Sequence, residues 1–246
     1  MSLDRLVAIM KRLRDPERGC EWDRVQTFST IAPYTIEEAY EVADAIHRND
    51  MTSLADELGD LQLQVVFHSQ MAEEAGHFDL QNVLDGLCDK LERRHPHLFG
   101  GLDQSPGWEA IKAEERIGNA DASALAGVAI ALPALERAHK LQKRAARTGF
   151  DWPDLDGPRS KIFEELEEVA QAPESEQAEE IGDLLFAVVN LARHLKVDPE
   201  EALRQANRKF EKRFRAIETA PGFSQMTLDE MEALWTEAKR SQALET

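Results

Sequence analysis

Apolar residues recur every three or four positions along most of the chain, the spacing that places them on one face of an α-helix. In the first half, this spacing predicts helices at about 3–13, 35–47, 52–75, 79–95 and 105–111. In the second half, it predicts helices at about 132–141, 159–171, 175–195 and 198–217, and a last helix that opens at 227. The alternating patterns and clusters of β-branched residues that would indicate strands are absent from the sequence. The sequence therefore predicts an all-α protein.

Polar residues that can cap a helix stand in front of three of these segments. Asp79 precedes the fourth helix as a candidate N-cap. Asp198 is followed by a proline at the first helical position and by Glu201 at the third. Thr227 and Glu230 have the spacing of a capping box. These signals predict where the helices begin.

The order of sequence features repeats once along the chain. The pattern Glu-Glu-x-x-Glu begins at residue 37 and again at 164, and Glu-x-Gly-Asp begins at 57 and again at 180. Tryptophans at 22 and 108 recur at 152 and 235, and a basic triplet at 90–94 recurs at 209–213. Two copies of one helical module explain this order. We predict module one at 1–118, a linker rich in Ala, Gly, Ser and Asp at 119–131, and module two at 132–246, each with four-helix-bundle-like packing.

Acidic residues outnumber basic ones, 47 to 29, which gives a formal net charge of -18. A surface of this sign disfavours a nucleic-acid partner, because binding to a phosphate backbone requires positive charge. A phosphorylated small molecule would need a bound cation and a few well-placed Lys or Arg side chains.

Cysteine usage and hydropathy indicate the cellular setting. Only two cysteines are present, Cys20 and Cys88, which are too few for a disulfide framework. The first residues lack the apolar core of a signal peptide, and no apolar run approaches the roughly 20 residues that span a bilayer. We expect a cytoplasmic protein that does not bind membranes.

The repeated carboxylates are candidate metal ligands. On a helix, Glu165 and Glu168 project together, and Glu180 and Asp183 project together from the next helix. If the two helices pack antiparallel, four carboxylates converge, although like charges repel and are costly to desolvate. A hard divalent cation offsets this cost, and carboxylate oxygens suit Mg²⁺. The alternative is a simply solvated acidic face, which the recurrence of both motifs disfavours.

Glu38, Glu41, Glu57 and Asp60 form the equivalent set in module one and are a second candidate metal site. The glycine inside each Glu-x-Gly-Asp, Gly59 or Gly182, lies mid-helix, where it costs about 1 kcal/mol relative to alanine. A close approach of two helices is one reason to retain it.

A di-iron site is a rival interpretation of the acidic residues. Glu-x-x-His, an element of di-iron four-helix bundles, occurs at 74–77, 92–95 and 136–139. None of the three recurs in the other module, and two stand at predicted helix ends. We therefore interpret these histidines as surface residues.

Longer stretches resemble the MazG family of all-α nucleoside triphosphate pyrophosphohydrolases, in particular its two-domain bacterial members. The resemblance extends over essentially the whole chain. It is carried by GCEWDRVQTFSTIAPYTIEEAYEV, ELGDLQLQVVFHSQMA, DKLERRHPHLFG, KLQKRAARTGFDW and EEIGDLLFAVVNLARHL. The resemblance implies hydrolysis of NTPs or dNTPs to the monophosphate and pyrophosphate, Mg²⁺ dependence with Mn²⁺ as a substitute, a homodimer, and a role in clearing the nucleotide pool.

By the same resemblance, residues of module two have assigned roles. Glu165, Glu168, Glu180 and Asp183 would be Mg²⁺ ligands. The substrate contacts would be Lys161, Glu179, Asn207, Lys209, Arg213 and Trp235, with Trp235 against the nucleoside. Lys209 and Arg213 share a helix face and supply positive charge that the composition otherwise lacks. Glu164 is a candidate to orient or deprotonate the attacking water.

The two modules differ at these positions. Tyr34 stands where module two has Lys161, and Cys88 where it has Asn207, so we expect module two to carry the activity. The segment between the two acidic motifs is shorter in module two, which affects the substrate contacts just before Glu180, including Glu179. Two other functions fit the sequence: a non-catalytic dimeric regulator that binds nucleotides or a partner protein, and a narrow-substrate pyrophosphohydrolase, for example for phosphoribosyl-ATP.

Overall fold

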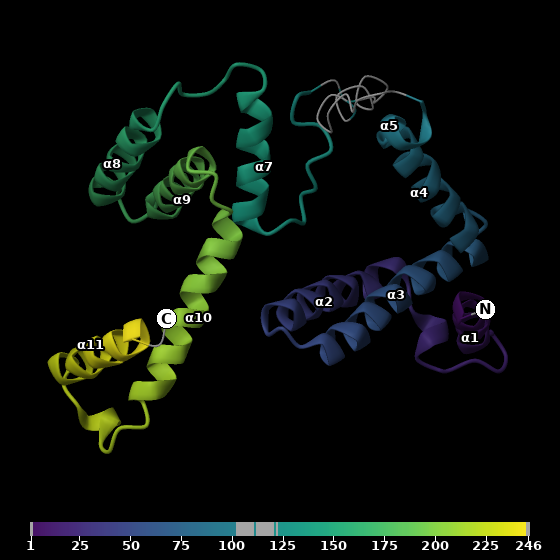
Figure 1. The fold of residues 1–246 in the computed structure, drawn as a ribbon, viewed down its shortest axis with the longest axis horizontal. Coiled ribbons are helices and arrows are strands. Elements are labelled where there is room, and N and C mark those ends of the chain that lie inside the picture. Colours follow the sequence, from purple (N-terminus) through teal and green to yellow (C-terminus); the bar gives the residue numbers. More distant parts are fainter. Residues whose placement is uncertain (1, 102–110, 112–120, 122, 245–246) are drawn as a thin grey trace. The chain divides into compact units, whose positions relative to one another are not determined.

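The computed structural model describes residues 2–101, 111, 121 and 123–244, and these residues form helices and loops without a strand (Figure 1). The all-α prediction is confirmed. The chain divides into two compact units, Met1–Glu114 and Glu115–Thr246; the described helices of module one lie in the first unit and those of module two in the second. None of the described helices is both long enough and apolar enough to cross a membrane.

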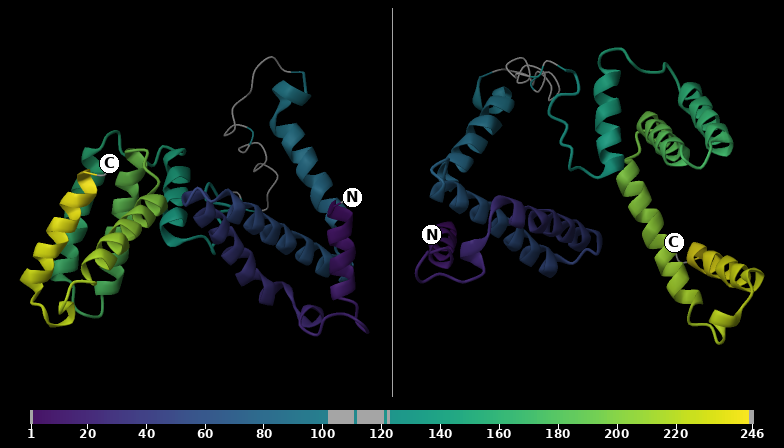
Figure 2. Two further views of the ribbon diagram at one scale, coloured as in Figure 1. Left: turned by 60° about the horizontal axis from the view of Figure 1, so that its bottom comes forward. Right: turned by 180° about the vertical axis from the view of Figure 1, so that it is seen from behind.

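Module one is built around a pair of long helices. Its elements are α1 (Ser2–Leu13), a 3-10 turn (Asp23–Val25), α2 (Phe28–His47), α3 (Met51–Glu74), α4 (Leu80–Arg94) and the short α5 (Pro96–Phe99). Helices α2 and α3 lie side by side, and α3 also packs against α1 and α4 (Figures 1 and 2). The core is made of Met10, Ile31, Val66, Phe67, Met71 and Leu80.

Helix α2 begins seven residues before its predicted start at 35. Thr27 caps it: the Thr30 amide donates to Thr27 Oγ1, and the Thr27 amide donates to Thr30 Oγ1. This pair forms a capping box made of two threonines. Pro33, which precedes the predicted start, lies inside the helix, so that boundary prediction is wrong.

Module two repeats the paired arrangement. Its elements are α7 (Ala134–Ala146), α8 (Asp156–Gln171), α9 (Gln177–His194), α10 (Pro199–Ile217), a 3-10 turn (Phe223–Gln225) and α11 (Leu228–Leu244). Helix α8 packs along α9, and α10 packs along α11 (Figure 2). Helix α7 contacts both α9 and α10.

The three helix starts that capping residues predicted are confirmed. The Asn82 amide donates to Asp79 at 2.8 Å, and the Glu201 amide donates to Asp198 at 2.9 Å. Thr227 and Glu230 form the predicted capping box. The helix predicted at 105–111 lies outside the described residues, except for Ile111.

The interpretation of the two mid-helix glycines is wrong. A Cβ atom built on Gly59 or on Gly182 would meet no atom of the described chain within 4 Å. Close helix packing within one chain therefore does not explain why glycine stands there.

Candidate active site

Three carboxylates of module two meet at the seam between α8 and α9. Glu165 and Glu168 come from α8 and Glu180 from α9, and one oxygen of each lies within 4.8 Å of the others. Glu165 is only 3% exposed, and its Oε2 is sealed from solvent without a hydrogen-bond partner among the described residues. A buried carboxylate oxygen without a donor is costly, and a cation at the seam would satisfy it.

The proximity of these groups shifts their protonation equilibria. The pKa of Glu168 is raised, first by a hydrogen bond with Glu165 and then by burial and by the charge of Glu165. The pKa of Glu180 is raised by burial first, and then by the charges of Glu165, Asp183 and Glu179. The charge of Asp183 thus acts on Glu180, although Asp183 is not one of the three residues whose oxygens lie within 4.8 Å of one another. Clustered oxygen donors of this kind match the preference of Mg²⁺.

Lys161 borders the cluster one helical turn earlier on α8. Its Nζ lies 2.7 Å from Glu164 Oε1 and 2.7 Å from Glu165 Oε1. The hydrogen bond to Glu164, followed by the one to Glu165, raises the pKa of Lys161, so it stays protonated. Glu164 itself is exposed. Lys161 therefore places one positive charge between the carboxylate cluster and Glu164, the candidate general base.

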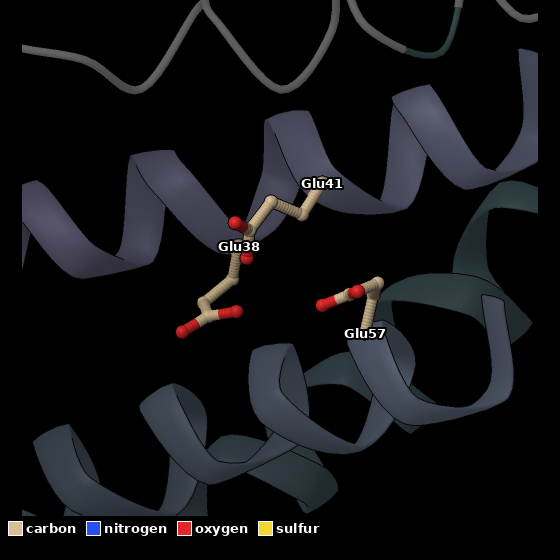
Figure 3. Close-up of side chains that lie close together, drawn as sticks. All are labelled: Glu38, Glu41 and Glu57. Carbon is tan, nitrogen blue, oxygen red and sulfur yellow. The ribbon is translucent and has the colours of Figure 1, made fainter. Parts of the chain in front are cut away.

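Module one holds the same carboxylate geometry. Glu38 and Glu41 project from α2 toward Glu57 on α3 (Figure 3), and one oxygen of each lies within 4.8 Å of the others. Burial first, and then neighbouring charges that include Asp60, raises the pKa of Glu38 and of Glu57. The position of Lys161 is taken here by Tyr34. Module one thus has a candidate metal site without the adjacent cation.

The remaining predicted substrate residues lie on other parts of module two. On α10 and α11, the Arg213 guanidinium stands 5.7 Å from the Trp235 ring centre, and Arg213 Nε donates to Gln242 at 2.8 Å. Asn207 and Lys209 are exposed on α10, and Glu179 is exposed on α9. None of these five lines the cavity that Lys161, Glu165 and Asp183 share. Within the described chain, Lys161 contacts the carboxylate cluster, whereas the predicted substrate residues of α10 and α11 do not line the cavity beside it.

The cavity itself contains residues that the sequence analysis did not single out as ligand contacts. It has a volume of about 470 Å³ and extends from the carboxylates between α7, α8 and α9. Its walls include Trp152, Phe186, Asn190 and Arg193. Arg193 is paired with Asp151, 42 positions away. No local spacing rule links two residues so far apart, which explains why they were missed.

The di-iron interpretation finds no support in the geometry. Glu74 is paired with Arg14 at 2.7 Å, and Glu136 with Lys140 at 2.6 Å. The ring of His95 is hydrogen-bonded to the Leu91 carbonyl oxygen. Among the described residues, the only metal-type groupings of three or more side chains are the two glutamate sets.

Comparison with known proteins connects this geometry to one family. The model of the MazG nucleotide pyrophosphohydrolase domain matches residues 26–99 and 159–217, once in each module. The chain is 51% identical to a nucleoside triphosphate pyrophosphohydrolase of Escherichia coli K12, over 98% of both chains. It is 46% identical to the nucleoside triphosphate pyrophosphohydrolase/pyrophosphatase MazG of Thermotoga maritima, over 96% of this chain and 95% of the relative.

A more distant relative covers the same length of chain. A nucleoside triphosphate pyrophosphohydrolase of Mycolicibacterium smegmatis is 31% identical over 96% of this chain. The resemblance inferred from the sequence motifs is therefore confirmed, and so is the tandem helical repeat. The chain belongs to the MazG nucleotide pyrophosphohydrolase family.

Proposed function

We propose that the chain hydrolyses nucleoside triphosphates to the monophosphate and pyrophosphate at the carboxylate cluster of module two, and thereby clears unwanted nucleotides from the pool. The observation that carries the proposal is that three clustered carboxylates and Lys161 lie together on the α8–α9 pair, where Lys161 contacts Glu165. The cluster can hold a cation and the lysine can meet a phosphate. The printed names of the curated relatives agree with this reaction.

Glu165, Glu168, Glu180 and Asp183 fit a divalent cation, for which we propose Mg²⁺ with Mn²⁺ as a substitute. The fit rests on their oxygen donors, on the sealed and unpaired Oε2 of Glu165, and on the raised pKa values of Glu168 and Glu180. A bound cation would neutralise phosphate oxygens and stabilise the charge on the leaving pyrophosphate.

The chain's own residues then position the substrate and move a proton. Lys161 presents its ammonium group beside the cluster, where a phosphate oxygen can replace Glu164 as one of its partners. Water attacks the α-phosphorus, the new P–O bond forms as the bond to the α–β bridging oxygen breaks, and pyrophosphate leaves. Glu164, which is exposed and next to the cluster, accepts the proton of the water.

We propose that Glu179, Asn207, Lys209, Arg213 and Trp235 contact the substrate only in a homodimer. Four of them lie on α10 and α11, and none lines the cavity beside the carboxylates in one chain. The α8–α9 pair also leaves Phe163, Leu166, Ile181 and Leu185 about half exposed or more, which is unusual for a finished helix bundle. A second copy of the chain would cover this face and bring its own α10–α11 pair within reach.

The first prediction concerns the products. With ATP and Mg²⁺, we expect AMP and pyrophosphate in equal amounts, because the cluster and Lys161 hold the terminal phosphates as one leaving group. Anion-exchange chromatography of the products measures this directly. ADP and phosphate as the main products would show that a different phosphorus is attacked.

The second prediction concerns which module works. Glu168→Ala or Asp183→Ala lowers kcat/KM by at least about 10²-fold, because it removes transition-state charge stabilisation. The matched variants Glu41→Ala and Asp60→Ala keep most of the activity, because module one has Tyr34 where Lys161 would be. A half-reduced rate in all four variants, or loss only in the module-one pair, would show that the assignment is wrong.

The third prediction concerns cation binding and its pH dependence. A raised pKa means that the folded protein binds the protons of Glu168 and Glu180 more tightly than the unfolded chain does. Without a cation, their contribution to stability is present at acidic pH and is lost as pH rises through the raised pKa values. Mg²⁺ binds the deprotonated cluster, so its stabilising effect grows over that same rise.

Calorimetric melting at neutral pH measures this effect. At about 100 times the dissociation constant, one site raises the free energy of unfolding by about 2.7 kcal/mol. The double variant Glu168→Gln with Glu180→Gln should lose the Mg²⁺ effect of module two. An equal Mg²⁺ effect below pH 4, or in that variant, would contradict cation binding at the cluster.

The fourth prediction concerns assembly. Light scattering coupled to gel filtration should give the mass of a dimer for the wild-type chain. Leu185→Glu, which places a charge on the exposed apolar face of α9, should shift the mass toward the monomer. Gln171→Glu adds the same charge at an exposed polar position of α8 and should leave the dimer intact. A wild-type monomer would contradict the proposal.

A further inference from the structure

The cavity beside the carboxylates contains one amide group whose orientation is fixed. Arg193 donates from Nε at 3.0 Å and from Nη2 at 2.7 Å to Oδ1 of Asn190. A guanidinium group can only donate, so the atom that faces it must be the oxygen of the amide. The Nδ2 group of Asn190 is then left as a donor.

Nothing in the described chain uses this donor. Asn190 is 8% exposed and lines the cavity, and its Nδ2 has no hydrogen-bond partner among the described residues. The Nδ2 atom is therefore unpaired but not completely sealed from solvent. A molecule inside the cavity can therefore reach it and accept its hydrogen bond. Water or a ligand in the cavity must supply the acceptor, and a ligand that does so gains a hydrogen bond from a donor that is already fixed in place.

A network of ion pairs holds the amide in place. Asp151 accepts from Arg193 Nη1 at 2.9 Å and lies 2.9 Å from His194 Nε2. The same carboxylate accepts from the Trp152 amide at 2.9 Å. Asp151 thus ties the loop before α8 to α9. Arg193 and Asp151 are positioning residues for both Asn190 and Trp152.

The indole of Trp152 forms a wall of the same cavity. A Cβ built on Gly157 would overlap the indole ring, so the ring lies directly on the backbone at the start of α8. Phe186 and Leu141 provide further apolar surface. The cavity thus joins apolar and aromatic walls to the fixed and unused donor of Asn190, while Lys161, Glu165 and Asp183 stand at the end where phosphates would bind.

We infer that this cavity holds the heterocyclic base of the nucleotide, and that Asn190 Nδ2 donates to a nitrogen or oxygen acceptor on the base edge. A flat aromatic ring with an acceptor fits aromatic walls and one fixed donor. A sugar fits poorly, because most of its hydroxyl groups would lose their hydrogen bonds there. The inference rests on the proposed function, since it takes the substrate to be a nucleotide, and it makes Asn190 a specificity-determining residue.

Module one keeps the tryptophan but differs at the positions of Lys161 and Asn190, which indicates that the cavity is not a by-product of the helical fold. Tyr34, Trp22 and Phe67 correspond to Lys161, Trp152 and Asn190. There the Trp22 ring packs edge-on against Tyr34 at 6.0 Å and against Phe67 at 6.4 Å. Aromatic side chains contact one another where module two presents a cation and an amide.

The test compares two probes that differ only in the base, AMP and ribose 5-phosphate, by calorimetric titration of the full chain with Mg²⁺ present. The wild type should bind AMP at least about tenfold more tightly, the typical effect of a satisfied buried hydrogen bond together with ring contact. Asn190→Leu and Asn190→Asp should lower AMP affinity toward that of ribose 5-phosphate. Neither variant should change binding of ribose 5-phosphate or pyrophosphate by more than about twofold.

Asn190→Asp retains the oxygen that accepts from Arg193 and replaces only the donor. It therefore tests the loss of the donor even if Asn190→Leu does not fold. Gln171→Leu removes an exposed amide from α8 and should leave the preference for AMP unchanged. Equal wild-type affinity for the two probes overturns the inference, as does an unchanged preference in both Asn190 variants. So does a parallel loss of all ligands. Because binding is measured without turnover, a chain that prefers AMP but releases no pyrophosphate from ATP would contradict the proposed function and not the base site.

Discussion

Repulsion between carboxylates that α8 and α9 bring within 4.8 Å is the constraint on which the rest of module two depends. Nothing in helix packing requires three glutamates at one seam, and one of them, Glu165, is almost fully buried. Lys161 compensates part of the charge through its contact of 2.7 Å with Glu165. The raised pKa values of Glu168 and Glu180 show that compensation within the chain is incomplete. The divalent cation and polyphosphate of the proposed function would offset this cost in stability.

The same constraint has a different outcome in module one. Glu38, Glu41 and Glu57 meet as closely as their counterparts do, yet the neighbouring side chain is Tyr34, which packs against Trp22. The neutral phenol of Tyr34 neutralises no phosphate charge, and Phe67, which stands where module two has Asn190, has no hydrogen-bond donor in its side chain. The geometry that gathers the carboxylates is thus common to both modules. The groups that would recognise a nucleotide are not, because Tyr34 and Phe67 stand where module two has Lys161 and Asn190.

The sequence was sufficient for features that depend on local spacing. Caps at Asp79, Asp198 and Thr227 act within three residues of the helix start, so their geometry could be predicted from the neighbouring residues in the sequence. The convergence of Glu165, Glu168 and Glu180 followed from helical periodicity and the pairing of successive helices. The start of α2 was misjudged because a threonine pair and a tolerated Pro33 do not follow the commoner capping pattern. The Asp151–Arg193–Asn190 network could not be predicted, because its partners meet only through the packing of the loop against α9.

The distribution of positive charge gives the strongest argument that one chain does not form the whole site. Lys161 already faces two carboxylates, so it can offset only a small part of a triphosphate's charge of about −4 in a protein of formal net charge -18. Arg213 stacks on Trp235 and donates to Gln242, and Lys209 is exposed one helical turn away. Neither residue lines the cavity beside the cluster. The apolar face of α8 and α9 that a second copy would cover belongs to the same helix pair as the carboxylates. In the proposed homodimer, burial of that face and supply of the missing cations would be two consequences of one association, which would link the stability of the bundle to the completeness of its substrate site.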